Sequence, residues 1–199
     1  MPRVRKAAPL TLPDFLCRIA AETARMSYPG SMSRGKQPVV LKDAKSRLEI
    51  YFTTRFPISS LWGDADGVAR DYDAWHEQQS QAIAEWIEEF VPARHSSVAV
   101  STKFLNTFMH QLMKYEPCRG LWQQLHLPLD RRVFKALGQF RPPSLSAVHG
   151  SFSRPPYSLD YAEYRNIQKA LWLYLAELNS RPGVGMQLNS RIELNWLWI

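Results

Sequence analysis

The chain has 199 residues, of which 45% are hydrophobic and 12% aromatic, and these fractions exclude an intrinsically disordered chain. A chain of this length fits one domain and can bury a sizeable core, so it needs neither disulfides nor a structural metal to fold. Lysine and arginine total 25 against 18 acidic residues, a formal charge of +7 that favours a polyanionic partner, with nucleic acid first and an acidic membrane surface second.

Seven or eight helices are expected along the chain, and no segment alternates in the way a sheet requires. Residues 1–10 are expected to form a loose basic arm, and residues 11–199 a single helical domain. Proline and glycine place loops at residues 57–67 and 140–158. In chain order, the predicted helices are residues 11–27, 39–55, 71–91, 97–115, 120–125, 131–139, 161–178 and 187–198.

The third of these helices shows the clearest helical period. Its aromatic and apolar positions, including Trp75, Ala82, Trp86 and Phe90, recur at steps of three and four residues. Residues 39–55 are less certain in type, because the pairs and triplets of β-branched and aromatic residues there also suit strands. The fold class that follows is all-α, a single-domain helical bundle.

Features typical of other locations and site types are missing from the sequence. The two cysteines, Cys17 and Cys118, have no ligand spacing, and the five histidines show no spacing suited to zinc. The basic start lacks the apolar run of a signal peptide, and no stretch of 18 apolar residues exists. We therefore expect a cytoplasmic, nucleoid-associated monomer that is not in a membrane and uses no metal or cofactor.

The most informative part of the chain is a lysine followed at a distance by an aspartate, each at the start of a predicted helix. Residues 101–106 read STKFLN, and residues 127–133 read LPLDRRV. This order resembles the helix-hairpin-helix DNA glycosylases, and the archaeal 8-oxoguanine glycosylases most of all. The likeness is strongest over residues 84–137. It implies that Lys103 and Asp130 are the catalytic pair and that double-stranded DNA is the partner.

The chemistry of such an enzyme suits these two residue types. Breaking an N-glycosidic bond builds positive charge on the sugar, which a nearby carboxylate stabilises. A neutral lysine amine can attack the anomeric carbon and form a Schiff base, and burial on an apolar helix face would favour that neutral amine. Taken alone, without the resemblance and the pairing, Asp130 also fits an ordinary helix cap. Lys103 alone likewise fits a solvated surface lysine.

The family's hairpin normally carries a glycine turn that binds a DNA phosphate through its amides. Residues 91–97, which stand in its place, contain no glycine. We expect basic and hydroxyl side chains to bind phosphate instead. The expected DNA-binding residues are Arg94, His95, Ser96, Arg131, Arg132 and Lys135. For Arg131, Arg132 and Lys135, a solvated helix face is the alternative.

A glycosylase must also extrude its target base and hold it between stacking and hydrogen-bonding side chains. For each tryptophan, packing in the core is the alternative role. The candidates for binding the base are Trp86, Asn106, Gln168, Trp172, Glu193 and Trp198.

The expected activity is removal of an 8-oxoguanine-like purine or of a hypermodified base, such as glucosylated hydroxymethylcytosine in phage DNA. An abasic site would remain, and a Schiff base on Lys103 would allow strand scission as well. Two other functions stay open: a non-catalytic helical DNA-binding module, and an interaction protein whose basic face meets an acidic protein.

Overall fold

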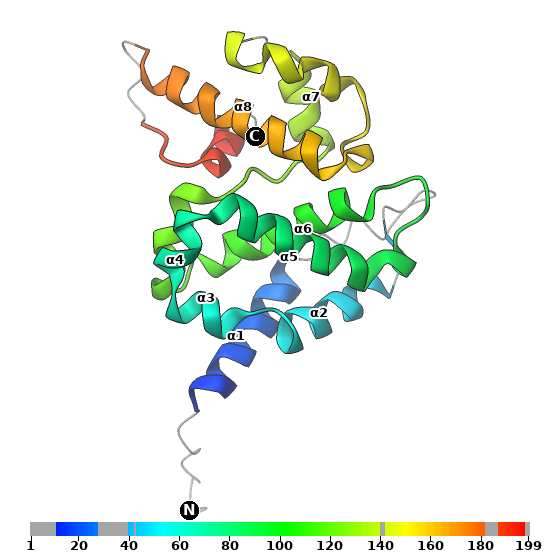
Figure 1. The fold of residues 1–199 in the computed structure, drawn as a ribbon, viewed down its shortest axis with the longest axis vertical. Coiled ribbons are helices and arrows are strands. Elements are labelled where there is room, and N and C mark those ends of the chain that lie inside the picture. Colours follow the sequence, from blue (N-terminus) through cyan, green and yellow to red (C-terminus); the bar gives the residue numbers. More distant parts are fainter. Residues whose placement is uncertain (1–10, 28–39, 42, 140–141, 182–186, 198–199) are drawn as a thin grey trace, which may run out of the picture.

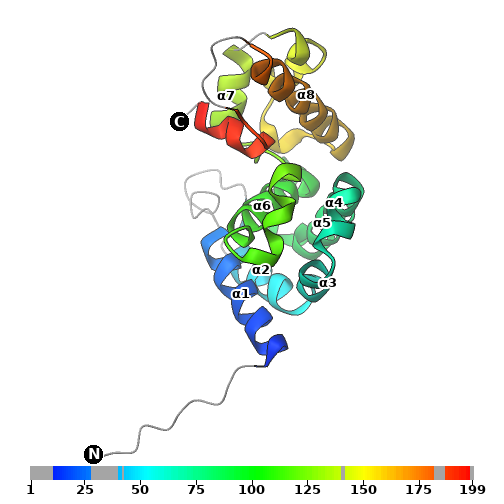
Figure 2. The ribbon, with the colours of Figure 1, turned by 90° about the vertical axis from the view of Figure 1, so that its left-hand side faces the viewer.

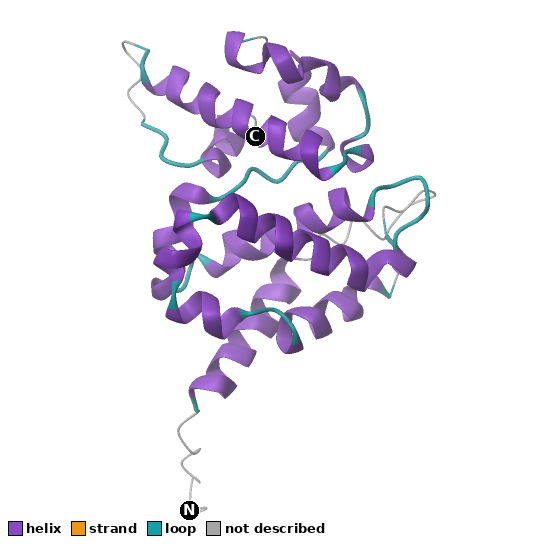
Figure 3. Ribbon diagram, in the orientation of Figure 1, coloured by secondary structure: helices purple, strands orange, loops and turns teal. Residues whose placement is uncertain are grey.

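A computed structural model describes residues 11–27, 40–41, 43–139, 142–181 and 187–197, and over these ranges the chain contains helices and no strand (Figures 1 and 3). The all-α prediction is confirmed. The expected arm at residues 1–10 lies outside the described residues. The α-helices are α1 (Leu12–Ser27), α2 (Ala44–Thr54), α3 (Ile58–Gly63), α4 (Ala65–Arg70), α5 (Tyr72–Ile87), α6 (Ser97–Leu112), α7 (Arg131–Gln139) and α8 (Tyr161–Asn179). The 3-10 helices are η1 (Glu88–Phe90), η2 (Glu116–Gln124), η3 (Pro143–Ser153), η4 (Pro156–Ser158) and η5 (Arg191–Leu197).

The helices form two lobes stacked along the long axis of the molecule (Figures 1 and 2). The N-terminal lobe contains α1 to α6 with η2, and the C-terminal lobe contains α7, η3, α8 and η5. Each lobe has its own apolar core. The seam between the two cores brings α6 against η4 and α8.

Aromatic packing dominates the core of the N-terminal lobe. Phe52 of α2 stacks on Phe108 of α6, with ring centroids 4.0 Å apart and an interplanar angle of 6°. Phe56 meets the same Phe108 ring edge-on at 4.9 Å. These contacts fix α2 across α6, and the helix over Ala44–Thr54 excludes the strand alternative for those residues.

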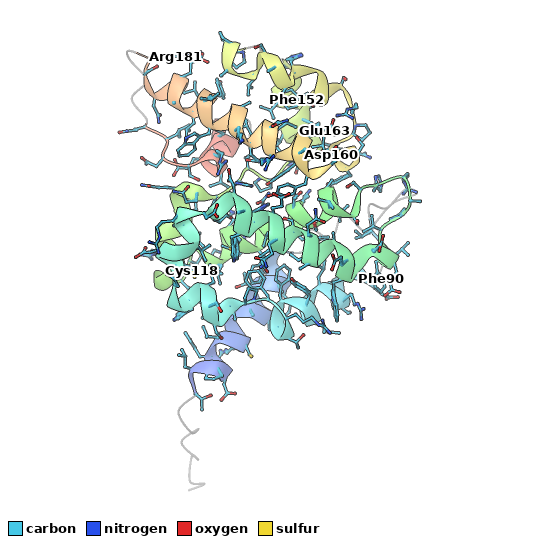
Figure 4. All side chains as sticks on the ribbon, viewed as in Figure 1. Phe90, Cys118, Phe152, Asp160, Glu163 and Arg181 are labelled. Carbon is cyan, nitrogen blue, oxygen red and sulfur yellow. The ribbon has the colours of Figure 1, made fainter. Side chains whose placement is uncertain are left out.

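The C-terminal lobe is built around α8. Asp160 and Glu163 form a capping box at its start, each side chain accepting a hydrogen bond from the other residue's backbone N–H (Figure 4). The buried side of α8 packs on η3, where Phe152 meets Phe134 of α7 edge-on at 5.5 Å. The loop that follows α7 is therefore part of the core rather than a surface connection.

Several predicted elements differ from the structure. The helix predicted at residues 39–55 begins at Ala44, and the one predicted at 120–125 is part of the 3-10 helix η2. Residues 57–67, expected as a loop, contain α3 and the first half of α4, because Asp64 caps α4 by accepting a hydrogen bond from Gly67 N–H at 2.9 Å. Residues 140–158, also expected as a loop, hold η3 and η4, each of which begins at a proline. The last helix is a 3-10 helix over Arg191–Leu197, shorter than the predicted 187–198.

Candidate active site

The segment before α6 sets the position of Lys103. Ser96 caps α6, its hydroxyl accepting a hydrogen bond from Ala99 N–H at 3.2 Å. The backbone N–H of Ser96 donates to the carbonyl of Tyr157 at 2.7 Å and so ties the start of α6 to η4. Lys103 lies in the second turn of this anchored helix, on the side that faces η4.

Asp130 is held at the start of α7 by the helix itself. Its Oδ1 accepts hydrogen bonds from the backbone N–H groups of Arg132 and Val133, at 2.9 and 3.1 Å. These bonds occupy one carboxylate oxygen and leave Oδ2 to face Lys103. The helix N-terminus also stabilises the negative charge.

Lys103 and Asp130 meet across the seam. Their Nζ and Oδ2 atoms are 3.6 Å apart, and the Lys103 amine also donates to the Tyr157 hydroxyl at 3.1 Å. The Lys103 side chain is only 11% exposed, whereas that of Asp130 is 34% exposed. The site is therefore a largely buried amine beside a carboxylate that solvent or a ligand can reach.

Basic side chains gather near this pair. His95 packs edge-on against Tyr157, with centroids 5.8 Å apart. Partial burial lowers the pKa of His95, and the positive charges of Arg94 and Arg131 lower it further. Its Nε2 is buried and has no hydrogen-bond partner among the described residues. The hairpin segment and the start of α7 thus form one basic region around Tyr157.

The remaining expected DNA-binding residues lie at the edges of this region. Arg132 and Lys135 are exposed on α7. Ser96 is not a free hydroxyl, since it caps α6. Phosphate binding by these residues remains a prediction.

Two of the expected base-binding residues support backbone or side chains near the seam instead of lining an open space. Gln168 pairs with both backbone groups of Leu127, accepting from its N–H at 3.0 Å and donating to its carbonyl at 2.8 Å. Glu193 accepts from the indole of Trp122 at 2.6 Å and from Asn189 N–H at 2.7 Å. These bonds hold the chain between η2 and α7, and the region around η5, in place.

The expected tryptophans do not gather at Lys103. Trp86 lies between the guanidinium groups of Arg47 and Arg55, whose carbons are 3.9 and 4.5 Å from its ring centroid. Its indole N–H donates to the carbonyl of Arg47 at 2.8 Å, so Trp86 packs onto α2. Trp172 is 44% exposed on α8. Trp198 lies outside the described residues.

Asn106, the last of the candidates, belongs to a buried chain of polar groups that crosses the seam. His76 Nε2 donates to Asn106 Oδ1 at 2.8 Å, and Asn106 Nδ2 donates to the Tyr164 hydroxyl at 2.8 Å. The Tyr164 hydroxyl lies 2.9 Å from His126 Nδ1, and His126 Nε2 lies 2.8 Å from the carboxylate of Asp73. Asn106 therefore positions other side chains one turn after Lys103.

The donor and acceptor of every hydrogen bond in this series follow in turn from the Asp73 end. Asp73 can only accept when ionised, so His126 donates from Nε2 and its Nδ1 accepts from Tyr164. The Tyr164 hydroxyl then accepts from the Asn106 amide, whose oxygen accepts from His76. His76 Nδ1 is left as an acceptor for the hydroxyl of Tyr161, 3.0 Å away. All of these groups are paired with both histidines neutral.

Burial keeps the histidines neutral. Desolvation lowers the pKa of His126 to about 4, against the opposing effect of its hydrogen bond to Asp73. Desolvation also takes the pKa of His76 well below its usual value, and the neighbouring His126 lowers it further. The hydrogen bond from His126 lowers the pKa of Asp73 to about 2. The sequence contained no spacing signal for this set, because its members come from four separate segments.

No family model, curated protein or solved structure matches the chain. Among the described residues, no helix is long and apolar enough to cross a membrane. No group of three or more metal-ligating side chains occurs in the same part of the chain. The candidate function therefore rests on the chemistry and positions of the side chains.

Proposed function

We propose that the protein is a DNA glycosylase with Lys103 as nucleophile and Asp130 as the stabilising carboxylate. The observation that carries the proposal is the 3.6 Å separation of the Lys103 amine from Asp130 Oδ2, reached from helices in two different lobes. A lysine and an aspartate 27 positions apart in sequence have no local reason to meet. Their meeting at one seam matches the chemistry expected of the pair.

The reaction would divide between the two side chains. As the bond from C1′ to the base breaks, its electron pair leaves with the base, and the Asp130 carboxylate stabilises the sugar cation. The ammonium of Lys103 must lose a proton before its amine can bond to C1′. Asp130 Oδ2 is close enough to receive that proton and pass it to the departing base. The C1′–O4′ bond of the sugar then breaks, the ring oxygen takes one of the two protons left on the nitrogen, and the nitrogen lone pair forms the C=N bond of the protonated Schiff base.

DNA would bind through the basic region around Tyr157. The positive charges of Arg94 and Arg131 both act on His95, and Arg132 is exposed on the same helix as Arg131. Lysine and arginine that neutralise phosphates release counterions, so affinity should fall as salt rises. The proposed substrate is duplex DNA carrying an oxidised purine or a hypermodified base.

Borohydride trapping tests the proposal. Duplexes carrying 8-oxoguanine, uracil, an abasic site or glucosylated hydroxymethylcytosine are incubated with protein and reductant, and both the covalent adduct and the abasic sites are measured. We expect an adduct with the wild-type protein and with Lys114→Gln, a control lysine that is exposed just beyond α6. Lys103→Gln should give none. If abasic sites form without an adduct, Lys103 is not the nucleophile. If no duplex gives either product, the proposed glycosylase activity is refuted.

A non-catalytic DNA-binding module is the second candidate, favoured by one observation. Asp130 already caps α7 and pairs with Lys103, so both residues have partners without any substrate. Under this alternative, Asp130→Asn would preserve the cap and leave DNA binding unchanged, and no base would be released by either form. Under the glycosylase proposal, the wild type releases the base and Asp130→Asn does not.

A further inference from the structure

A pocket of about 510 Å³ opens on the seam at the turn between α4 and α5, away from Lys103 and Asp130. Residues of α4, α5, η2, α8 and η5 line it, and neither member of the proposed catalytic pair is among them. The hairpin segment follows the other end of α5, near Phe90 (Figures 1 and 4). A 16-residue helix such as α5 is about 24 Å long, and the pocket and the hairpin segment lie at its opposite ends.

The pocket has a rigid floor. Arg191 is 6% exposed, donates to the carbonyl of Gln124 at 2.6 Å, and lies 3.8 Å from Asp73. The same guanidinium sits over the ring of Trp172, 5.5 Å from its centroid. Because Asp73 is also bound by His126, the buried polar chain of the seam ends at this floor. The indole of Trp172 is therefore held in place while 44% of the side chain stays exposed.

The rim carries charged side chains that pair with no other described residue. Asp71 precedes α5 without making a side-chain cap, and its side chain is exposed beside Arg70. Lys169 is exposed on α8, one turn before Trp172. No hydrogen bond or ion pair joins these three side chains to another residue of the described chain. The pocket thus offers two free cations, one free carboxylate and one open aromatic surface.

Two polar atoms of the wall also lack partners. The hydroxyl of Tyr72 and Nε of Arg191 are both buried without a hydrogen-bond partner among the described residues. Unpaired buried groups are rare in folded proteins. Tyr72 and Arg191 both line the pocket, whose wall is therefore less completely hydrogen-bonded than a protein interior usually is.

We propose that this pocket binds a nucleotide whose base carries an amino group, at a site separate from Lys103 and Asp130. Arg70 and Lys169 suit a phosphate, since both are donors without a partner. The base would stack on Trp172, and its amino group would donate a hydrogen bond to the carboxylate of Asp71. Carboxylates accept such a bond from the amino group of cytosine in DNA. The volume falls within the range of small-molecule sites.

Calorimetric titration of the whole protein tests the site, with dAMP and dCMP as ligands. Both should bind, whereas dTMP, which lacks the amino group, and deoxyadenosine, which lacks the phosphate, should bind at least about tenfold more weakly. Trp172→Ala and Lys169→Ala should each weaken dAMP binding about tenfold or more. Lys45→Ala, a lysine on α2 paired only with Glu49, is the matched control and should change nothing.

Further arms separate the possible results. Displacement of dAMP by a duplex with a single-stranded adenine overhang would assign the site to a strand end, and lack of displacement would assign it to a free nucleotide. No binding of dAMP up to about 1 mM would overturn the proposal. So would binding that survives Trp172→Ala and Lys169→Ala, or that is lost in Lys103→Gln. Because trapping on DNA reports only on Lys103, the glycosylase proposal and this one fail independently.

Discussion

Acidification should destabilise the protein through His76 and His126. Both side chains are buried and paired as neutral rings, and burial holds both pKa values below that of an exposed histidine. Above a pH of about 6.5, folded and unfolded chains are both neutral at these positions. Below it, the unfolded chain gains protons that the folded chain cannot accept, and folding stability is lost.

The size of the loss follows from the two pKa values. With a folded pKa of about 4 for His126 and an unfolded value of about 6.5, going from about pH 7 to pH 5 costs about 2 kcal/mol. Burial also takes the pKa of His76 well below its usual value, so His76 adds to this loss. The loss from His126 alone is a sizeable part of the stability of a typical domain. For His126 the loss should level off below a pH of about 4.

Urea unfolding followed by far-UV circular dichroism, at several pH values between about 7 and 5, measures this loss. His126→Gln can still accept a hydrogen bond from Tyr164 and donate one to Asp73, but it cannot titrate, so it should remove about 2 kcal/mol of the loss. His149→Gln, outside the polar chain on η3, is the control and should keep the wild-type slope. A stability that does not change over this range, or a His126→Gln slope equal to that of wild type, would refute the reasoning.

Four further substitutions, at three positions, separate structure from chemistry. Asp130→Ala should lower the free energy of unfolding by about 1 kcal/mol through the lost cap, and Asp130→Asn should not, because asparagine caps equally well; thermal unfolding of the pair checks this. Phe108→Ala should cost about 3–5 kcal/mol in urea unfolding, since it removes the ring stacked at 4.0 Å on Phe52; a loss below about 1 kcal/mol would contradict the packing. Tyr157→Phe keeps the ring but removes the hydroxyl 3.1 Å from Lys103, so trapping should slow about fivefold while DNA affinity stays constant; equal trapping rates would exclude a positioning role for Tyr157.

Local chemistry made several features of the fold predictable from sequence. Ser96 before an apolar stripe and Asp130 before a helical run mark helix starts, and the structure has α6 and α7 beginning there. The capping at Asp64 was missed, because two glycines nearby favoured a loop and Asp64 is the single residue between α3 and α4. The 3-10 helix η3 was missed for a related reason, since its prolines and serines resemble those of a surface loop.

The candidate site was predictable only in part. Order along the chain and a resemblance singled out Lys103 and Asp130, and the structure brings them within 3.6 Å. Tyr157 could not be found in this way, because nothing in residues 140–158 indicated that a tyrosine would reach α6. The series of buried hydrogen bonds that links Asp73 to His76 could not be predicted either. Its partners are separated by between 30 and 58 positions in the sequence, and their pairing depends on how the lobes meet.

The polar chain across the seam has a consequence for how the lobes recognise each other. Apolar cores tolerate small displacements, because dispersion forces have little directional preference. The series of hydrogen bonds from Asp73 through His126, Tyr164 and Asn106 does not tolerate such displacements, because each bond needs a defined geometry. If one lobe shifted by a helical turn, these buried groups would lose their partners, and each loss is costly in an interior. The chain thus selects a single register for the two lobes, and with it the one alignment of α6 and α7 in which Lys103 and Asp130 are neighbours.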